Sequence, residues 1–334
     1  MSHFFRAFQS LFFVFSLTSF LVCSGCIKPK ITLFPDGAEP LKEYTLQGSG
    51  KQKILIIPIK GFISDSPRNL PLYRKVGMVQ EVVAHLKRAE KDEDIKAVLL
   101  KIDSPGGSVT ASDILYHEIL KFKERSGVKL IAVMMGVAAS GGYYISLSAD
   151  LVMAHPTSIT GSIGVVFLQP NVSGLMDKMG LEVQIDKSGR NKDMGSPFRK
   201  ATPEEQKIVQ GLVDDLAGRF LSLVDERRKL SDEAKKDIAS ARIYTASDAL
   251  RLGLVDRIGY LDDAILETIR MAGLPEDARV VVYRRSEYAD DNFYNTSSSK
   301  RGMPDINLIQ LDLVESIPPF RSGFYYLWLP GQSD

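Results

Sequence analysis

Cysteine, histidine and net charge are all scarce in this sequence of 334 residues. The only two cysteines, Cys23 and Cys26, stand close together near the N-terminus, so the rest of the chain can contain no thiol nucleophile, disulfide or cysteine-based metal site. None of the four histidines stands at ligand spacing from another histidine or from a Glu motif. We therefore expect no metal and no cofactor.

The charges are balanced and dispersed. The formal net charge is +1, and Lys and Arg are scattered among acidic residues rather than gathered in a stripe. This pattern argues against a nucleic-acid partner. With 44% hydrophobic and 25% charged residues, the chain has ample material for a globular core. Because the chain after Cys26 has no cysteine to form a disulfide, the stability of this part must come from that core.

The N-terminal 26 residues read as a signal peptide or a membrane anchor. The apolar run at residues 11–22 is short for a membrane span but suits the hydrophobic region of a signal peptide. Residues 21–26 (LVCSGC) resemble the lipobox of bacterial lipoproteins, in which Cys26 would be acylated after cleavage, although Cys23 departs from that pattern. The alternative is an uncleaved anchor. Either version ties the rest of the chain to a membrane, outside the cytoplasm.

The segment that follows, residues 27–52, contains Pro, Gly and Lys without sustained periodicity, which predicts a tether. Beyond it, apolar runs typical of strands alternate with helical patterns. The strand runs cover residues 53–61, 97–103, 129–135, 151–154 and 164–167. Residues 77–89 have helical spacing, and a capping box at residues 202–205 predicts the start of a long helix. This alternation predicts an α/β fold with a mostly parallel sheet flanked by helices.

The most informative stretch is residues 136–144 (GVAASGGYY), which follow the strand at residues 129–135. Residues 137–139 lead into an expected helix start, so Ser140 would lie where free backbone N–H groups favour negative charge. Gly141 and Gly142 would let a substrate backbone approach closely. The sequence favours a nucleophile at Ser140, while tight packing around an incidental serine is the alternative.

Two further segments are candidates for binding. Gly106 and Gly107 follow a strand and can present backbone N–H groups to an oxyanion or a phosphate, but no P-loop spacing is present. Residues 186–197 are polar without periodicity and predict a loop. The C-terminal region, residues 286–334, combines a polar segment with the aromatic run 324–329, which would add a strand or cover a hydrophobic groove.

Four motifs together resemble the signal peptide peptidase A family, serine peptidases of the S49 group with the ClpP/crotonase-type fold of repeated β-β-α units. The motifs are residues 103–107 (DSPGG), 137–144 (VAASGGYY), 160–165 (TGSIGV) and 188–197 (SGRNKDMGSP). The resemblance runs from about residue 53 to residue 259, within an expected peptidase domain at residues 53–285. It implies a Ser/Lys dyad, with Ser140 as nucleophile and Lys192 as general base.

The resemblance also implies the supporting roles. Ser162 matches the serine that orients the lysine amine, and the backbone N–H groups of Gly107 and Gly141 would form the oxyanion hole. Tyr143 and Tyr144 are candidates to line the substrate groove, with core packing expected for at least one of them. The neighbouring Lys187 is expected to be structural.

A lysine base must lose its proton before it can accept one. Because the ordinary pKa of lysine is about 10.4, the amine has to be desolvated. In shorter members of the family this cover is implied to come from a ring-forming homo-oligomer, in which one subunit supplies the serine and its neighbour the lysine. The implied substrates are cleaved signal peptides and other hydrophobic peptides, bound extended at the outer face of the bacterial cytoplasmic membrane.

Three other readings remain open from the sequence. His155 could be the base with Asp150 as its orienting partner, because both closely follow Ser140 in the chain. The chain could be a membrane-tethered ring scaffold without catalysis. It could also be a crotonase-like enzyme acting on acyl-CoA, although export argues against that substrate.

Overall fold

The computed structural model describes residues 40–69, 74–285, 287–288, 291–295 and 322–328. The expected signal peptide or anchor, residues 1–26 including Cys26, lies outside the described residues. Of the helices that the structure does describe, none combines the length and apolar character needed to cross a membrane.

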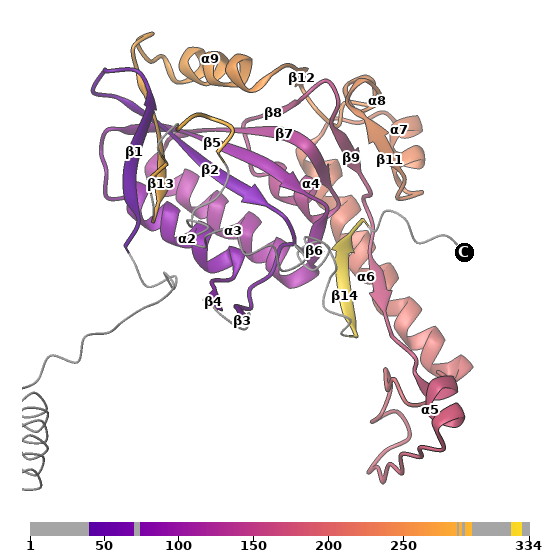
Figure 1. The fold of residues 1–334 in the computed structure, drawn as a ribbon. Coiled ribbons are helices and arrows are strands. Elements are labelled where there is room, and N and C mark those ends of the chain that lie inside the picture. Colours follow the sequence, from indigo (N-terminus) through magenta and orange to yellow (C-terminus); the bar gives the residue numbers. More distant parts are fainter. Residues whose placement is uncertain (1–39, 70–73, 286, 289–290, 296–321, 329–334) are drawn as a thin grey trace, which may run out of the picture. The chain divides into compact units, whose positions relative to one another are not determined.

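The main sheet explains why the strand runs are so apolar (Figure 1). Its strands, in spatial order, are β1 (Lys42–Gln47), β13 (Arg279–Arg284), β2 (Lys53–Lys60), β5 (Ile95–Ser104), β7 (Lys129–Ala139), β8 (Leu151–Ala154) and β12 (Arg257–Ile258). From β13 to β12 every pairing is parallel, whereas β1 is antiparallel to β13. Strands of a parallel sheet are covered on both faces, so they read as continuous hydrophobic runs. The mostly parallel α/β sheet is the one the sequence predicts.

Helices cover both faces of this sheet. The described helices are α2 (Met78–Ala89), α3 (Val109–Ser126), α4 (Gly141–Ser146), α5 (Ser173–Met179), α6 (Pro203–Arg227), α7 (Asp232–Ile238), α8 (Ala246–Arg251) and α9 (Leu261–Ala272). In Figure 1, α2 and α3 lie on one side of the sheet and α9 on the other. The long capped helix expected from residues 202–205 is α6, whose Thr202 and Glu205 form the capping box.

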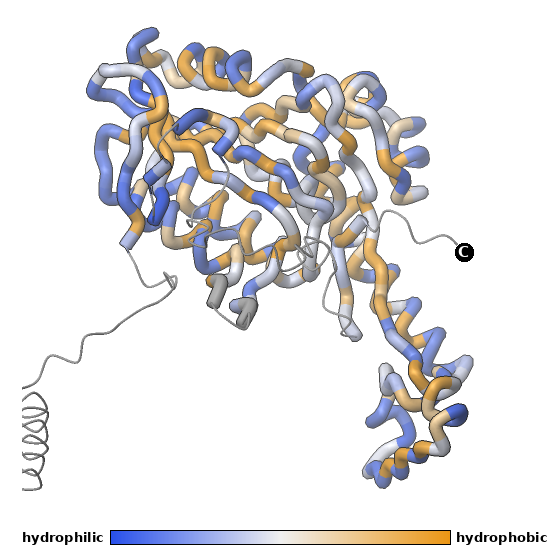
Figure 2. The backbone as a smooth tube through the Cα atoms, viewed as in Figure 1, coloured by the Kyte–Doolittle hydropathy of each residue, from blue (hydrophilic) through white to orange (hydrophobic). Residues whose placement is uncertain are grey.

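The alternation of side chains along a strand separates two cores. Leu55 and Ile57 of β2 pack in the core beneath α2, α3 and α4, whereas Ile54 and Ile56 pack beneath α9. In Figure 2 the strands between these two layers are largely apolar, in agreement with their burial. The hydrophobic cores therefore hold the ends of β5 and β7 in place, and the candidate catalytic residues follow those ends.

The structure corrects the expected tether. Residues 42–47 form β1, which pairs with β13 at the edge of the main sheet, with Lys42 opposite Arg284. The expected linker character was wrong for this part because the partner strand lies more than two hundred residues later and leaves no local signal. The folded domain therefore includes residues from at least Lys42 onward.

Smaller strands extend the sheet near the candidate site. β9 (Ile159–Gly161) pairs with the end of β7 and with β11 (Ile243–Thr245). A separate sheet has the order β10 (Val166–Leu168), β14 (Gly323–Leu327) and β6 (Gly106–Ser108), and β3 (Arg68–Asn69) pairs with β4 (Arg74–Lys75). The aromatic C-terminal run thus contains a strand, and this strand pairs with β6, which contains Gly107, an expected site residue.

Candidate active site

Ser140 lies at the junction between β7 and α4 in a backbone conformation that is rare for serine. Its φ is 52° and its ψ is −114°. A non-glycine residue in such a region costs on the order of 1–3 kcal/mol and persists only where its surroundings hold it. The Ser140 N–H donates to the Gly161 carbonyl at 2.7 Å, and the Ser140 carbonyl accepts from Tyr144 N–H at 2.8 Å. The strand runs to Ala139, further than expected, so the turn falls on Ser140 itself.

The hydroxyl of Ser140 is buried and unpaired. The residue is 1% exposed, and Oγ has no hydrogen-bond partner among the residues that the structure describes. A buried hydroxyl normally finds a partner, so an orphaned one at a strained turn marks a position to be explained by function. No base among the residues that the structure describes is bound to it.

Gly107 and Gly141 bring backbone amides together beside Ser140. A Cβ atom added to Gly141 would lie 3.2 Å from the Gly107 N, and one added to Gly107 would lie 2.0 Å from the Ile63 carbonyl oxygen. Gly106 has a φ of 104°, which favours glycine. The structure therefore packs the two expected oxyanion-hole glycines against each other, with no room for a side chain on Gly107.

Ser162 is also brought to this point. It follows Gly161, whose carbonyl accepts the Ser140 N–H, and β9 pairs in parallel with β7 so that Gly161 lies opposite Ala139. Ser162 has a φ of 50° and donates its N–H to the Arg242 carbonyl at 2.8 Å. Two serines with positive φ thus stand at the ends of neighbouring strands.

Lys192 is placed differently from the other four. It is exposed, in the segment between α5 and α6, and is not bonded to the Ser140 hydroxyl, which has no partner among the described residues. Lys187 donates to Asp193 Oδ1 at 2.7 Å. The structure therefore brings Ser140, Gly107, Gly141 and Ser162 together within one chain, but not Lys192.

The alternative base pair is separated by a strand. Asp150 and His155 flank β8, so at about 3.3 Å per residue they stand about 16 Å apart. Asp150 forms an ion pair with Lys123 at 2.8 Å, and its other oxygen accepts the Leu130 N–H. His155 is in contact with Thr157 instead. The geometry gives no support to a His155 and Asp150 pair.

Tyr143 and Tyr144 lie in the core, so the expectation that they line the groove is corrected. Their exposed fractions are 0% and 1%. The Tyr143 hydroxyl donates to the Leu254 carbonyl at 3.0 Å, and the Tyr144 hydroxyl donates to Asp113 Oδ1 at 2.7 Å. Both rings can be buried because each hydroxyl has a hydrogen-bond partner.

The sequence did not predict that β14 would lie beside the candidate site. β14 is antiparallel to β6, with Tyr326 opposite Gly107, and antiparallel to β10 on its other side. A Cβ atom on Gly106 would lie 2.0 Å from the Tyr326 carbonyl oxygen and 2.8 Å from the Gly141 N. The Tyr326 ring is fully buried and stacks on Tyr144. The aromatic run was the available signal, but it could not distinguish a groove from a sheet edge.

The comparisons with known proteins agree with this geometry. The model of peptidase family S49 matches residues 122–274, and the Clp protease model matches residues 69–162. A putative signal peptide peptidase from Enterococcus faecium is 36% identical over 74% of this chain and 72% of that protein. A putative protease from Synechocystis is 38% identical over 69% of this chain and 78% of that protein. Protease 4 of Haemophilus influenzae is 31% identical over 72% of this chain but only 38% of its own length.

Fold and relatives together define a serine peptidase of the α/β ClpP type. More specifically, the chain belongs to peptidase family S49.

Proposed function

We propose that this protein is a membrane-associated serine endopeptidase in which Ser140 is the nucleophile and Lys192 the general base. The observation that carries the proposal is the Ser140 turn, where an unpaired hydroxyl lies beside the backbone of Gly107 and Gly141. A neutral lysine amine takes the proton from the Ser140 hydroxyl, whose oxygen attacks the peptide carbonyl. The Gly107 and Gly141 N–H groups stabilise the oxyanion.

The remaining steps use the same groups. The lysine ammonium returns its proton to the leaving amine as the carbon–nitrogen bond breaks, which leaves an acyl group on Ser140. Water, deprotonated by the lysine, then releases that acyl group. Ser162 orients the lysine amine in this scheme, in keeping with its place next to Ser140.

The lysine comes from a neighbouring subunit in this proposal. Lys192 is exposed, and Ser140 Oγ has no partner within the part of the single chain that the structure describes. We use the name arm for α5 together with residues 180–200, and Figure 2 shows apolar positions along it. Its exposed apolar side chains are Leu175, Met179, Leu181, Val183, Ile185 and Phe198. A second copy packed on the arm would bury these side chains, and repetition of that contact would close a ring.

The substrates that fit are extended hydrophobic peptides, including signal peptides after their removal from preproteins. β14 supports this class because it is an extended strand paired with β6 beside Gly141. The Tyr326 ring contacts the rings of Tyr144 and Phe220 in the core, so the strand that pairs with β6 carries a large apolar side chain. A peptide bound in the same way would be held by main-chain hydrogen bonds.

The membrane association rests on the N-terminal sequence. The apolar run at residues 11–22 would direct export, and either an uncleaved anchor or an acylated Cys26 would keep the domain at the outer face of the bacterial cytoplasmic membrane. This location would place the peptidase beside the peptides that signal-peptide cleavage leaves in the bilayer.

Covalent labelling tests the proposal against a ring scaffold without catalysis. A fluorophosphonate probe should label the full chain, and labelling should disappear in Ser140→Ala, whereas Ser146→Ala, a buried serine of the same helix, should still be labelled. Mass spectrometry of the labelled peptide identifies the residue. The proposal would be contradicted if Ser140→Ala were labelled as strongly as the wild type. It would also be contradicted if the wild type were not labelled and did not cleave a peptide substrate.

Removal of β14 should increase access to Ser140. In this proposal a substrate strand would bind along β6, the strand with which β14 pairs, so a peptide has to displace β14 before it binds. A chain ending at Ser322 should therefore react faster with a peptide substrate, roughly tenfold, because a tethered competitor is lost. The measurement is kcat/KM, with a chain ending at Trp328 as the control that keeps β14. If the chain without β14 folds but its kcat/KM is equal to or lower than that of the control, the substrate does not bind in the place of β14.

A further inference from the structure

A few contacts tie the segment that carries Lys192 to the rest of the chain. The Val172 N–H donates to the Pro197 carbonyl at 2.8 Å, and Arg190 forms an exposed ion pair with Glu204. Residues 180–200 contain no helix or strand. Local turns shape the segment, with the Lys192 N–H donating to the Gly189 carbonyl at 3.1 Å and the Met194 N–H to the Asn191 carbonyl at 3.1 Å. Such turns fix the path of the chain near Lys192, but they do not attach it to the rest of the domain.

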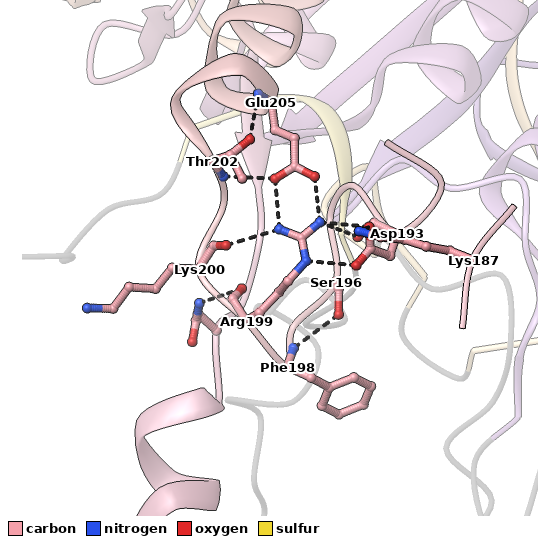
Figure 3. Close-up of polar contacts among 9 residues, drawn as sticks. Lys187, Asp193, Ser196, Phe198, Arg199, Lys200, Thr202 and Glu205 are labelled. Atoms are coloured by element: carbon pink, nitrogen blue, oxygen red, sulfur yellow. Dashed lines mark hydrogen bonds and ion pairs between the residues drawn. The ribbon is translucent and has the colours of Figure 1, made fainter. Parts of the chain in front are cut away.

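Among these attachments, the Arg199 side chain makes the largest number of hydrogen bonds, to both Asp193 and Glu205 (Figure 3). Its guanidinium donates from Nε to Asp193 Oδ2 at 2.7 Å and from Nη2 to Asp193 Oδ1 at 2.8 Å. It also donates from Nη1 to Glu205 Oε2 at 2.8 Å and from Nη2 to Glu205 Oε1 at 2.5 Å. One side chain thus bridges two carboxylates in bidentate fashion, and one of them belongs to the residue directly after Lys192.

Glu205 is itself held in place. It belongs to the capping box of α6, in which its carboxylate accepts the Thr202 N–H at 2.8 Å and its own N–H donates to Thr202 Oγ1. The Glu205 side chain is only 2% exposed. Hydrogen bonds from Arg199 lower the pKa of Glu205 to about 2 and hold the pKa of Asp193 below its ordinary value. Both carboxylates are therefore charged at neutral pH.

The connection continues into the core beneath Ser140. Phe220, on the same helix as Glu205, is fully buried and packs against the ring of Tyr144 at a centroid distance of 4.9 Å. Tyr144 lies on α4, the helix that begins after Ser140. A continuous set of contacts therefore leads from Asp193 through Arg199 and α6 to the helix of the nucleophile.

We propose that Arg199 is a positioning residue that fixes the segment carrying Lys192 at the N-terminus of α6. This inference rests on the proposed role of Lys192 as the base. A lysine cannot replace Arg199, because an ammonium lacks the planar set of donors that engages two carboxylates at once. Without the clamp, the fold and the subunit contact remain, but the lysine amine loses its fixed orientation toward the Ser140 hydroxyl of the neighbouring subunit.

The experiment compares full-length Arg199→Ala and Arg199→Lys with the wild type. We expect kcat on a fluorogenic peptide to fall roughly 10–100-fold in both, with KM changed less than threefold, because orientation acts on the chemical step. The matched control is Arg190→Ala, which removes an arginine of the same segment whose ion pair with Glu204 is exposed. That variant should stay within twofold of the wild type, and all variants should keep the wild-type oligomeric state and melting temperature.

A double substitution separates positioning from a general structural role. In the Lys192→Ala background, adding Arg199→Ala should not lower the residual activity further, because there is no amine left to position. The inference is overturned if both Arg199 variants behave like Arg190→Ala, or if Arg199→Ala lowers the residual activity of Lys192→Ala by its full factor. A fully active Lys192→Ala would instead refute the base assignment, and with it any need for positioning.

Discussion

Replacement of Lys192 by alanine should lower peptide hydrolysis roughly 10²–10⁴-fold in the intact protein. Removal of a general base typically costs roughly 10²–10⁴-fold in rate, and here the same amine would also reprotonate the leaving group. The expected loss falls on kcat, since Lys192 is not expected to hold the substrate. Steady-state kinetics with a fluorogenic peptide gives the value, and the melting temperature shows whether the variant is folded.

Two control variants make this result specific. Lys200→Ala removes another exposed lysine from the same segment and should leave activity within about twofold, because surface charges rarely affect chemistry. His155→Ala should also retain activity, since His155 and Asp150 stand at opposite ends of β8. A fully active Lys192→Ala together with an inactive His155→Ala would show that the base was assigned to the wrong residue.

The pH dependence of kcat/KM is an independent test of whether Lys192 is the base. If the reactive form has a neutral amine, kcat/KM should rise toward alkaline pH through a single ionisation. The ionisation should be missing from the residual activity of Lys192→Ala. A profile that is flat above neutral pH in the wild type would contradict a lysine base.

Gly107→Ala should be the most damaging small change on the oxyanion side. The added Cβ would lie 2.0 Å from the Ile63 carbonyl oxygen and 2.6 Å from the Ile63 N, so backbone must shift against backbone. Because that shift moves the Gly107 N–H, we expect kcat to fall roughly 10²–10³-fold, the loss typical of one oxyanion donor. The measurement is kcat, with circular dichroism and thermal melting as checks of folding.

Gly211→Ala is the control for this change. Gly211 lies within α6 and a Cβ there would meet no atom within 4 Å, so the variant should be as active as the wild type and at least as stable. Should Gly107→Ala unfold, labelling of the remaining folded fraction by a fluorophosphonate still reports on the site. Near-normal kcat in a folded Gly107→Ala would remove Gly107 from the oxyanion hole.

The sequence predicted the parts of the site that have local causes. The strand before Ser140 and the glycines around it are contiguous, so the turn at Ser140 could be located from residues 129–144 alone. The backbone conformation of this turn could not be predicted from these residues. The positive φ of Ser140 depends on the bond to Gly161 and on β9, which pairs only in the folded sheet. The helix begins directly after Ser140, as expected, whereas the preceding strand extends to Ala139 rather than ending at residue 135.

The errors arose where distant segments meet. Residues 42–47 have no strong strand pattern of their own, and they become β1 because the edge of β13 is available. Tyr143 and Tyr144 look amphipathic in sequence, but Asp113, Leu254 and the ring of Tyr326 keep them inside. The clamp around Arg199 was missed although its members are close in sequence. The capping box predicted a bond from Glu205 back to Thr202, but not that the same carboxylate would also bind Arg199.

Mixing two inactive variants tests most directly whether Ser140 and a neighbour's Lys192 act together. Ser140→Ala and Lys192→Ala should each be inactive alone. When they are co-expressed in equal amounts, about a quarter of the sites in a ring would pair an intact serine with an intact lysine from the next subunit. We therefore expect peptidase activity to return to about that fraction of the wild-type value. Mixed assemblies that form normally yet stay inactive would contradict a site shared between subunits.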